Sequence, residues 1–188
     1  VTAVSGAGLE SAPSNRAGSC HITLEVGWNL VSWPLAPHTT SLSDLLSPLG
    51  GACDGVWAYD AWDDSDPWKH WTGDLVDADE KMGLWLYMTE PAILPITGRQ
   101  PVSTTIDLHA GWNLVGYPAQ TARPVTEALA SISGLYANIQ TFDPTDPADP
   151  WRRYDVNVPV YASDLDLMEP GRGYWIYVTA ACTLIIAP

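Results

Sequence analysis

Cationic side chains are scarce in this sequence. Its 188 residues include only 8 Lys and Arg against 22 Asp and Glu, which gives a formal net charge of −14. Nucleic acids and anionic membrane surfaces are bound through basic patches, so this composition argues against both as partners. We therefore expect a neutral or cationic partner.

Long apolar runs are also absent. No stretch of about 18 apolar residues occurs, and the first residues lack a basic segment followed by an apolar one. We expect no membrane insertion and infer that any signal peptide has been removed. The acidic, lysine-poor, proline-rich and Trp/Tyr-rich composition is typical of an extracellular bacterial module, which predicts a secreted or cell-surface protein.

Cysteine is rare and odd in number. The three residues are Cys20, Cys53 and Cys182, so at least one thiol has no partner within the chain and a disulfide framework does not hold the fold. Two interpretations remain open. Cys20 and Cys182 could form one bridge that joins the outer strands, or all three thiols could be buried as small apolar groups.

Phenylalanine occurs once, whereas the chain has ten Trp and eight Tyr. Trp and Tyr combine a large apolar ring with a polar group, so they suit surfaces that are only partly dry. This choice of aromatic residues favours a binding face. The hydrophobic fraction of 46% is enough for a packed core.

One sequence occurs twice in nearly the same form. GWNLVSWP spans residues 27–34 and GWNLVGYP spans residues 111–118, with the two motifs 84 positions apart. β-rich runs precede both motifs, and each motif together with its preceding run reads as paired strands or as one bent strand. Internal repetition of this kind predicts one supersecondary unit built twice.

The segments after each motif also correspond. Ser41 and Asp44 suggest a helix start, and a short amphipathic helix is predicted in each copy. Its apolar positions are Leu42, Leu45, Leu46 and Leu49 in the first copy and Val125, Ala128, Leu129 and Ile132 in the second. Apolar alternation on both sides of acidic, proline-containing stretches (61–67 and 144–150) predicts a hairpin with a long loop in each copy.

These patterns predict a mainly β fold of the β-rich α+β kind, made of two tandem repeats related by a pseudo-twofold axis. Each repeat contains several antiparallel strands and one short helix. We expect a flexible arm over 1–19, repeat 1 over 20–98 and repeat 2 over 99–188, with 20–188 forming one compact unit through a shared core or a tight interface. Seven additional residues in the second copy are expected in a surface loop near 157–166.

The GWNLV motifs, followed by GLWLY at 83–87 and GRGYWIYV at 171–178, resemble the GWNLV…GYW repeat of large secreted or surface-attached bacterial proteins. The resemblance covers nearly everything from His21 onward. It implies an accessory extracellular module beside other domains of the same polypeptide, and it carries no catalytic residues over to this chain. The first copy departs from the GxGYW ending, with Lys81-Met82-Gly83-Leu84 in its place.

Comparison of the two copies divides the ten tryptophans into a matched and an unmatched group. Six residues match in pairs and are interpreted as core or hairpin anchors: Trp28 with Trp112, Trp68 with Trp151, and Trp85 with Trp175. The other four have no tryptophan at the corresponding position and are interpreted as free for a ligand. They are Trp33, Trp57, Trp62 and Trp71, and Trp57 and Trp71 are expected to share one side of the hairpin.

The predicted ligand is a polysaccharide or cell-surface glycan. A pyranose stacks its apolar face on an aromatic ring while nearby carboxylates accept its hydroxyl hydrogen bonds, and Asp60 and Asp64 lie close to these tryptophans in sequence. In an alternative interpretation, the four rings cover the junction between the copies and contact no ligand. The corresponding alternative function is a structural or adhesive spacer in a larger surface protein.

The sequence contains no catalytic or metal-binding signature that supports a third function as well as a binding module or a spacer is supported. The acidic loops lack the spacing of a calcium-binding loop, and solvated turns are the favoured interpretation over calcium sites. The four histidines form no metal pattern, and no nucleophile or phosphate-binding motif occurs. We therefore predict no cofactor, no metal and no enzymatic activity; a glycoside hydrolase is the least favoured function.

Overall fold

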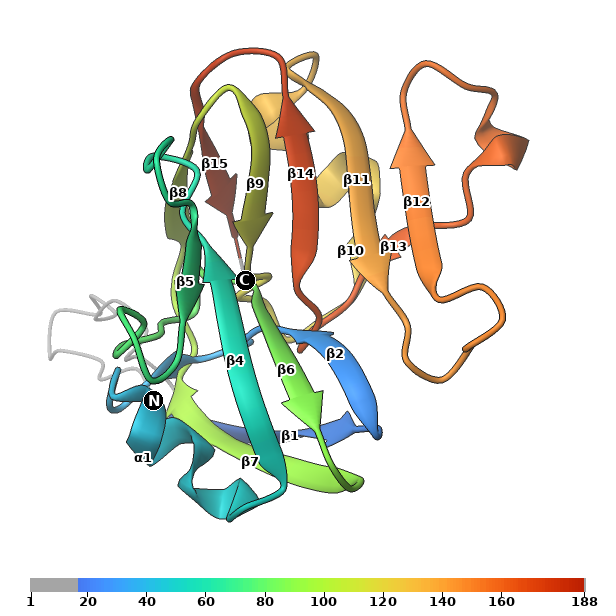
Figure 1. The fold of residues 1–188 in the computed structure, drawn as a ribbon. Coiled ribbons are helices and arrows are strands. Elements are labelled where there is room, and N and C mark those ends of the chain that lie inside the picture. Colours follow the sequence, from blue (N-terminus) through green and yellow to red (C-terminus); the bar gives the residue numbers. More distant parts are fainter. Residues whose placement is uncertain (1–16, 188) are drawn as a thin grey trace, which may run out of the picture.

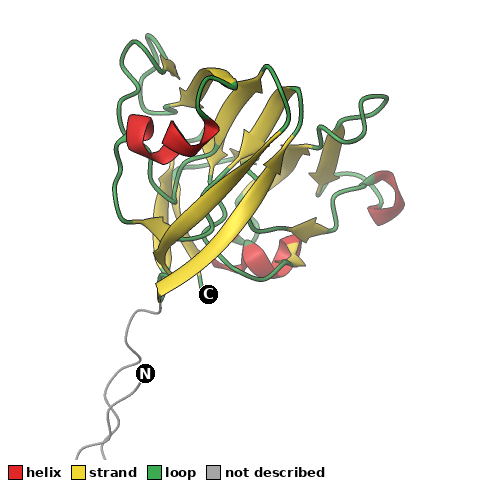
Figure 2. Cartoon of the chain, turned by 90° about the horizontal axis from the view of Figure 1, so that it is seen from below, coloured by secondary structure: helices red, strands yellow, loops and turns green. Residues whose placement is uncertain are grey.

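The computed structural model describes residues 17–187, and its sheets are built of antiparallel strands (Figures 1 and 2). The first half contains β1 (Ala17–Leu24), β2 (Gly27–Val31), β3 (Ala36–Pro37), α1 (Leu42–Leu46), η1 (Ser47–Leu49), β4 (Cys53–Tyr59), β5 (Trp68–His70), β6 (Leu84–Met88) and β7 (Ala92–Arg99). The predicted mainly β fold is confirmed. Within residues 17–187, no helix is long and apolar enough to cross a membrane.

The second half repeats this order. It contains β8 (Thr104–Leu108), β9 (Gly111–Val115), β10 (Arg123–Pro124), α2 (Val125–Ala128), η2 (Ala130–Ile132), β11 (Tyr136–Phe142), β12 (Trp151–Asp155), η3 (Val160–Ala162), β13 (Leu167–Met168), β14 (Tyr174–Val178) and β15 (Cys182–Ile186).

Strand pairing is also repeated. A four-stranded sheet has the order β2-β6-β4-β5 in the first half and β9-β14-β11-β12 in the second. A separate antiparallel ladder joins β1 to β7 in the first half and β8 to β15 in the second. Both predicted hairpins are present, with Tyr59 opposite Trp68 and Phe142 opposite Trp151.

The GWN part of the repeated motif turns the chain from one sheet into the other. Gly27 and Gly111 have φ values of 90° and 108°, which favour glycine. The buried Asn29 side chain accepts a hydrogen bond from the Glu25 N–H at 2.9 Å and donates to the carbonyls of Glu25 and Gly27. Asn113 makes the equivalent contacts with His109 and Gly111. β1 and β2 therefore lie in different sheets, so of the two alternatives drawn from the sequence, paired strands or one bent strand, the pairing is wrong.

Each half has its own apolar core. One cluster includes Leu24, Val56 and Leu86, and the other includes Leu108, Ile139 and Ile176. The predicted helices cover these cores. In α1 and η1, Leu42, Leu46 and Leu49 are buried, and the Ser41 hydroxyl accepts a hydrogen bond from the Asp44 N–H at 3.4 Å.

The halves are joined by reciprocal backbone contacts. The Ser32 N–H donates to the Gly171 carbonyl at 3.0 Å, and the Gly116 N–H donates to the Lys81 carbonyl at 2.7 Å. A Cβ atom at Gly83 would lie 2.8 Å from the Val115 carbonyl oxygen, and one at Gly173 would lie 2.8 Å from the Val31 carbonyl oxygen. The glycine retained in both closing motifs therefore allows the backbone of the opposite half to approach. Each half thus keeps its own apolar cluster, and backbone contacts join the two halves.

The first strand begins earlier than expected, and the insertion of the second half lies in a connection between strands. β1 begins at Ala17, so the last part of the expected arm is a strand that pairs with β7 as far as Arg99. The remainder of that arm, 1–16, lies outside the described residues. The longer connection in the second half lies between β12 and β13, as predicted, and contains η3.

All three cysteines are free thiols, and Cys20 and Cys182 lie in different sheets. Each partly buried thiol packs against the core of its own half, so the bridge between Cys20 and Cys182 is not formed. Burial raises the pKa of all three thiols, because a thiolate loses solvation when it is buried. The thiols act as small apolar groups, which is the other interpretation drawn from the sequence.

Candidate functional site

Strand alternation places aromatic rings on the outer face of both four-stranded sheets. In β6, Leu84, Leu86 and Met88 are buried while Trp85 and Tyr87 point to the opposite face. β14 repeats the pattern with Trp175 and Tyr177. Because the two halves meet side by side, the rings of both sheets form one surface, which we call the aromatic groove. Its rings are Trp28, Trp57, Tyr59, Trp68, Trp85, Trp112, Phe142, Trp151 and Trp175.

The two halves contribute to the groove reciprocally. Trp85 of the first half contacts Phe142 and Trp151 of the second half, with ring centroids 5.2 and 5.8 Å apart. Trp175 of the second half contacts Tyr59 and Trp68 of the first half, with ring centroids 5.0 and 5.8 Å apart. Each half therefore completes the aromatic surface of the other.

Two hollows open along the groove. The first compartment has a volume of about 530 Å³ and is lined by Trp28, Trp57, Trp68, Trp85, Phe142 and Trp151. The second compartment has a volume of about 470 Å³ and is lined by Tyr59, Trp68, Trp85, Trp112, Gln140, Trp151 and Trp175. Trp68, Trp85 and Trp151 line both, so the two hollows adjoin each other.

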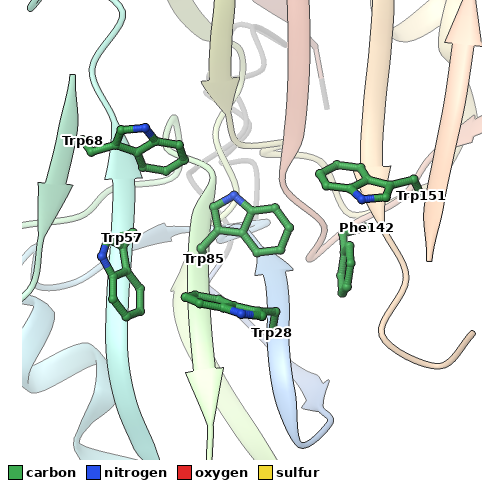
Figure 3. A pocket seen from close by; sticks show the side chains of 6 residues that line it. All are labelled: Trp28, Trp57, Trp68, Trp85, Phe142 and Trp151. Carbon is green, nitrogen blue, oxygen red and sulfur yellow. The ribbon is translucent and has the colours of Figure 1, made fainter. Parts of the chain in front are cut away.

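The rings of the first compartment stand around an open space rather than forming one flat platform (Figure 3). Trp28 lies at 90° to Trp85, and Phe142 lies at 80° to Trp151. Trp28 and Trp151 remain 42% and 41% exposed, so their rings are accessible from solvent. In such edge-to-face pairs, the edge of one ring lies against the face of its neighbour.

One position breaks the pseudo-twofold symmetry of the groove. Trp57 in β4 corresponds to Gln140 in β11. The Trp57 ring lies over Gly55, where an added Cβ would approach the ring to 2.3 Å. In the second half, Asn138 occupies the position of Gly55, accepts a hydrogen bond from the Gln140 amide at 2.9 Å and donates to Asp155. The first compartment is thus fully aromatic, whereas the second contains an amide.

A polar hollow adjoins the second compartment. It has a volume of about 400 Å³ and is lined by Gln140, Asp149, Trp151, Arg153, Ala162 and Asp164. Asp149 and Asp164 are exposed carboxylates, and the Arg153 N–H donates to Asp164 at 2.6 Å. The groove therefore passes from a wholly aromatic end to an end with donors and acceptors.

Cations beside the groove are held by carboxylates in both halves. Lys69, next to Trp68, lies 2.6 Å from Asp63 and 3.5 Å from Asp74. Arg152, next to Trp151, lies 2.6 Å from Asp146 and 3.7 Å from Asp164. The hydrogen bond from Lys69 lowers the pKa of Asp63, and that from Arg152 lowers the pKa of Asp146, because each stabilises the ionised carboxylate.

The acidic loops are turns closed by their own aspartates. The Asp60 carboxylate accepts a hydrogen bond from the Trp62 N–H at 2.9 Å, and Asp143 accepts from Thr145 at 3.1 Å. Asp63 accepts from the N–H groups of Ser65 and Asp66. Between residues 17 and 187, no group of three or more His, Cys, Asp or Glu side chains is arranged to hold a metal ion.

The residues predicted from sequence to bind a ligand are separated by the fold. Trp57 lines the groove. Trp62 is 60% exposed but packs beside His109, outside both compartments, with ring centroids 5.0 Å apart. Asp60 and Asp64 are exposed on the same loop and line neither compartment.

Two of the predictions for single rings are wrong. Trp33 is only 1% exposed and belongs to the first core, as Tyr117 does in the second, so it cannot stack on a ligand. Trp71 is partly buried against the first core, and Tyr154 is placed likewise in the second half. Trp71 follows His70, which is paired with Trp57, so the two tryptophans point to opposite faces.

The tryptophans shared by both copies were interpreted as core or hairpin anchors. Their assignment to the core is wrong, whereas Trp68 and Trp151 do pack across their hairpins, against Tyr59 and Phe142. All six line the groove, and four are well exposed: Trp28, Trp68, Trp112 and Trp151. A signal was present in the sequence, because Trp85 and Tyr87 alternate with Leu84, Leu86 and Met88. Such alternation indicates the face opposite the core.

Comparisons of this chain with protein-family models, with curated proteins and with solved structures found no match.

Proposed function

We propose that this chain is a non-catalytic carbohydrate-binding module that acts outside the cell, beside other domains of its polypeptide, and holds a polysaccharide in the aromatic groove. The observation that carries the proposal is the groove itself, in which nine rings from two sheets line two adjoining, partly exposed hollows. Exposed apolar surface of this extent is kept in folded proteins mainly for binding.

The polar end supports a saccharide as the ligand. A sugar ring offers an apolar face to aromatic rings and hydroxyl groups to hydrogen-bonding partners. Gln140 in the second compartment and Arg153 and Asp164 in the adjoining hollow supply both donors and acceptors. A saccharide chain long enough to reach from Trp85 to this end would use both kinds of contact.

Three carboxyl groups of the second half are unsuited to the proton-donor role of a glycoside hydrolase. Glycoside hydrolysis generally needs one carboxylic acid whose pKa is raised so that it can donate a proton. Hydrogen bonds from Thr145, Arg152 and Asn157 lower the pKa values of Asp143, Asp146 and Asp155, respectively. A screen of the protein on chromogenic glycosides would reveal turnover if a hydrolase were nevertheless present.

Affinity electrophoresis and calorimetry against a panel of soluble polysaccharides test the proposal. Trp151 lines both compartments, so Trp151→Ala should weaken binding about 30-fold, as expected for removal of a central aromatic contact worth about 2 kcal/mol. Trp62→Ala is the matched control, because Trp62 is exposed but lies outside the groove. It should bind like the unmodified protein.

The opposite result, in which Trp62→Ala loses affinity and Trp151→Ala keeps it, would contradict a site in the groove. If no polysaccharide binds at all, the alternative function of a structural or adhesive spacer is favoured. The reciprocal backbone pairing of the two halves would then serve as a stiff connection between neighbouring domains.

A further inference from the structure

We propose that the first compartment binds an alkylammonium group, and that this group is a substituent of the glycan held in the groove. This inference rests on the proposed function and specifies the chemistry of its ligand. It starts from the composition of the compartment wall, which consists of six aromatic side chains and contains no amide, hydroxyl or carboxylate side chain.

A wall of this kind offers few hydrogen-bond partners to the hydroxyl groups of a neutral sugar. Its hydroxyl groups lose water on entering the hollow and need directed hydrogen-bond partners in exchange. Among the described residues, the compartment offers only indole N–H groups, which can donate but cannot accept. A quaternary ammonium needs no hydrogen-bond partner, and the negative faces of aromatic rings attract it directly.

Ring orientation favours the same ligand. Trp28 stands at 60° to Trp57 and at 90° to Trp85, and Trp85 stands at 65° to Phe142. These rings contact one another edge to face, with Trp85 in the middle of the group (Figure 3), so a cation in the hollow would lie against ring faces that remain open to solvent. A cation needs only to lie within about 6 Å of the centroid of an aromatic ring to be attracted by the face of that ring.

The electrostatics of the chain complement a cation. The net charge is −14, and the compartment wall contains no Lys or Arg. Three cationic side chains adjoin residues that line the compartment: Lys69, Arg152 and Arg172. Each of them lies within 4 Å of two carboxylates, which offset their repulsion. The field of the protein as a whole therefore attracts cations toward the groove.

A titration with choline chloride and with its neutral isostere 3,3-dimethylbutan-1-ol, followed by tryptophan fluorescence at constant ionic strength, isolates the effect of charge. The two probes have nearly the same shape. We expect choline to bind at least tenfold more tightly, with one site per chain. Equal affinity for the two probes would overturn the inference, because an apolar hollow without cation recognition would explain it.

Trp28→Ala and Trp112→Ala form a matched pair of variants. The residues occupy equivalent positions in β2 and β9 and are 42% and 37% exposed, but only Trp28 lines the first compartment. Trp28→Ala should reduce choline affinity at least tenfold, and Trp112→Ala should leave it within twofold. A similar loss in both variants would place the cation elsewhere and overturn the proposal.

A third comparison tests whether a glycan carries the group. Hydroxyethylcellulose bearing quaternary ammonium substituents should bind more tightly than both free choline and unsubstituted hydroxyethylcellulose, and Trp28→Ala should abolish that advantage. If the substituted polymer binds no better than choline, the glycan-borne group is contradicted. If the polysaccharide panel binds but choline does not, the inference fails and the proposed function stands; if neither binds, both fail.

Discussion

Replacing Trp33 with alanine is expected to destabilise the protein by about 3–5 kcal/mol. The side chain is 1% exposed, and its removal leaves a large cavity among Leu35 and the other residues of the first core. The neighbouring backbone is tied to the other half through the Ser32 N–H, so the core has little freedom to collapse into the space. Chemical denaturation followed by circular dichroism measures the change.

Trp62→Ala is the control for this prediction. Trp62 is 60% exposed and contacts the ring of His109, so its loss should cost less than about 1 kcal/mol. A similar destabilisation in both variants would contradict the assignment of Trp33 to the core. Glycan binding by folded Trp33→Ala should be retained, because the residue is remote from the groove wall.

Converting the second compartment into a copy of the first should create a second ammonium site. The required changes are Gln140→Trp and Asn138→Gly, which reproduce Trp57 and the Gly55 beneath it. Gln140→Trp alone should fail, because Asn138 fills the space that the new ring would need. We expect calorimetry with choline to give two sites per chain for the double variant and one for the unmodified protein.

A loss of stability of about 1 kcal/mol is expected in the double variant, because glycine weakens the interior of β11. The stoichiometry is therefore measured on protein whose circular dichroism spectrum shows that it is folded. A folded double variant that still binds one choline would contradict the symmetry argument. Gly55→Asn provides the reverse test, since it should displace the Trp57 ring and reduce choline affinity.

The fold could be predicted in good part from the sequence, because its evidence is local and occurs twice. GWNLV at 27–31 and 111–115 revealed the duplication, and the leucine spacing after Ser41 located the first helix. The pairing of β1 with β7 could not be derived this way. It depends on the turn at Gly27, where Asn29 directs the chain into another sheet.

The candidate site was harder to predict because it depends on how the halves meet. The shared rings were interpreted as core or hairpin anchors on the general tendency of large aromatics to be buried, yet Trp28 and Trp112 face outward. Trp33 and Tyr117 differ between the halves and are both buried, since either ring fills its core. A difference between copies therefore indicates tolerance of a substitution and gives no direct measure of exposure.

Among the four tryptophans that the sequence predicted to bind a ligand, only Trp57 lines the groove. It has no aromatic counterpart in the second half. The contact of Trp85 with Phe142 and Trp151 joins residues from different halves, and no periodicity within one segment reveals such a contact. The groove can therefore be recognised only when the pseudo-twofold arrangement of the two halves is known.

The central claim is that ligands are held by the groove that both halves build. The indole N–H signals of ¹⁵N-labelled protein, titrated with a soluble oligosaccharide selected from the polysaccharide panel, test it most directly, because each of the ten tryptophans gives one signal. We predict shifts among the signals of Trp28, Trp57, Trp68, Trp85, Trp112, Trp151 and Trp175, which line the groove. The signals of Trp33, Trp62 and Trp71 should stay in place. Shifts confined to those three would contradict the claim.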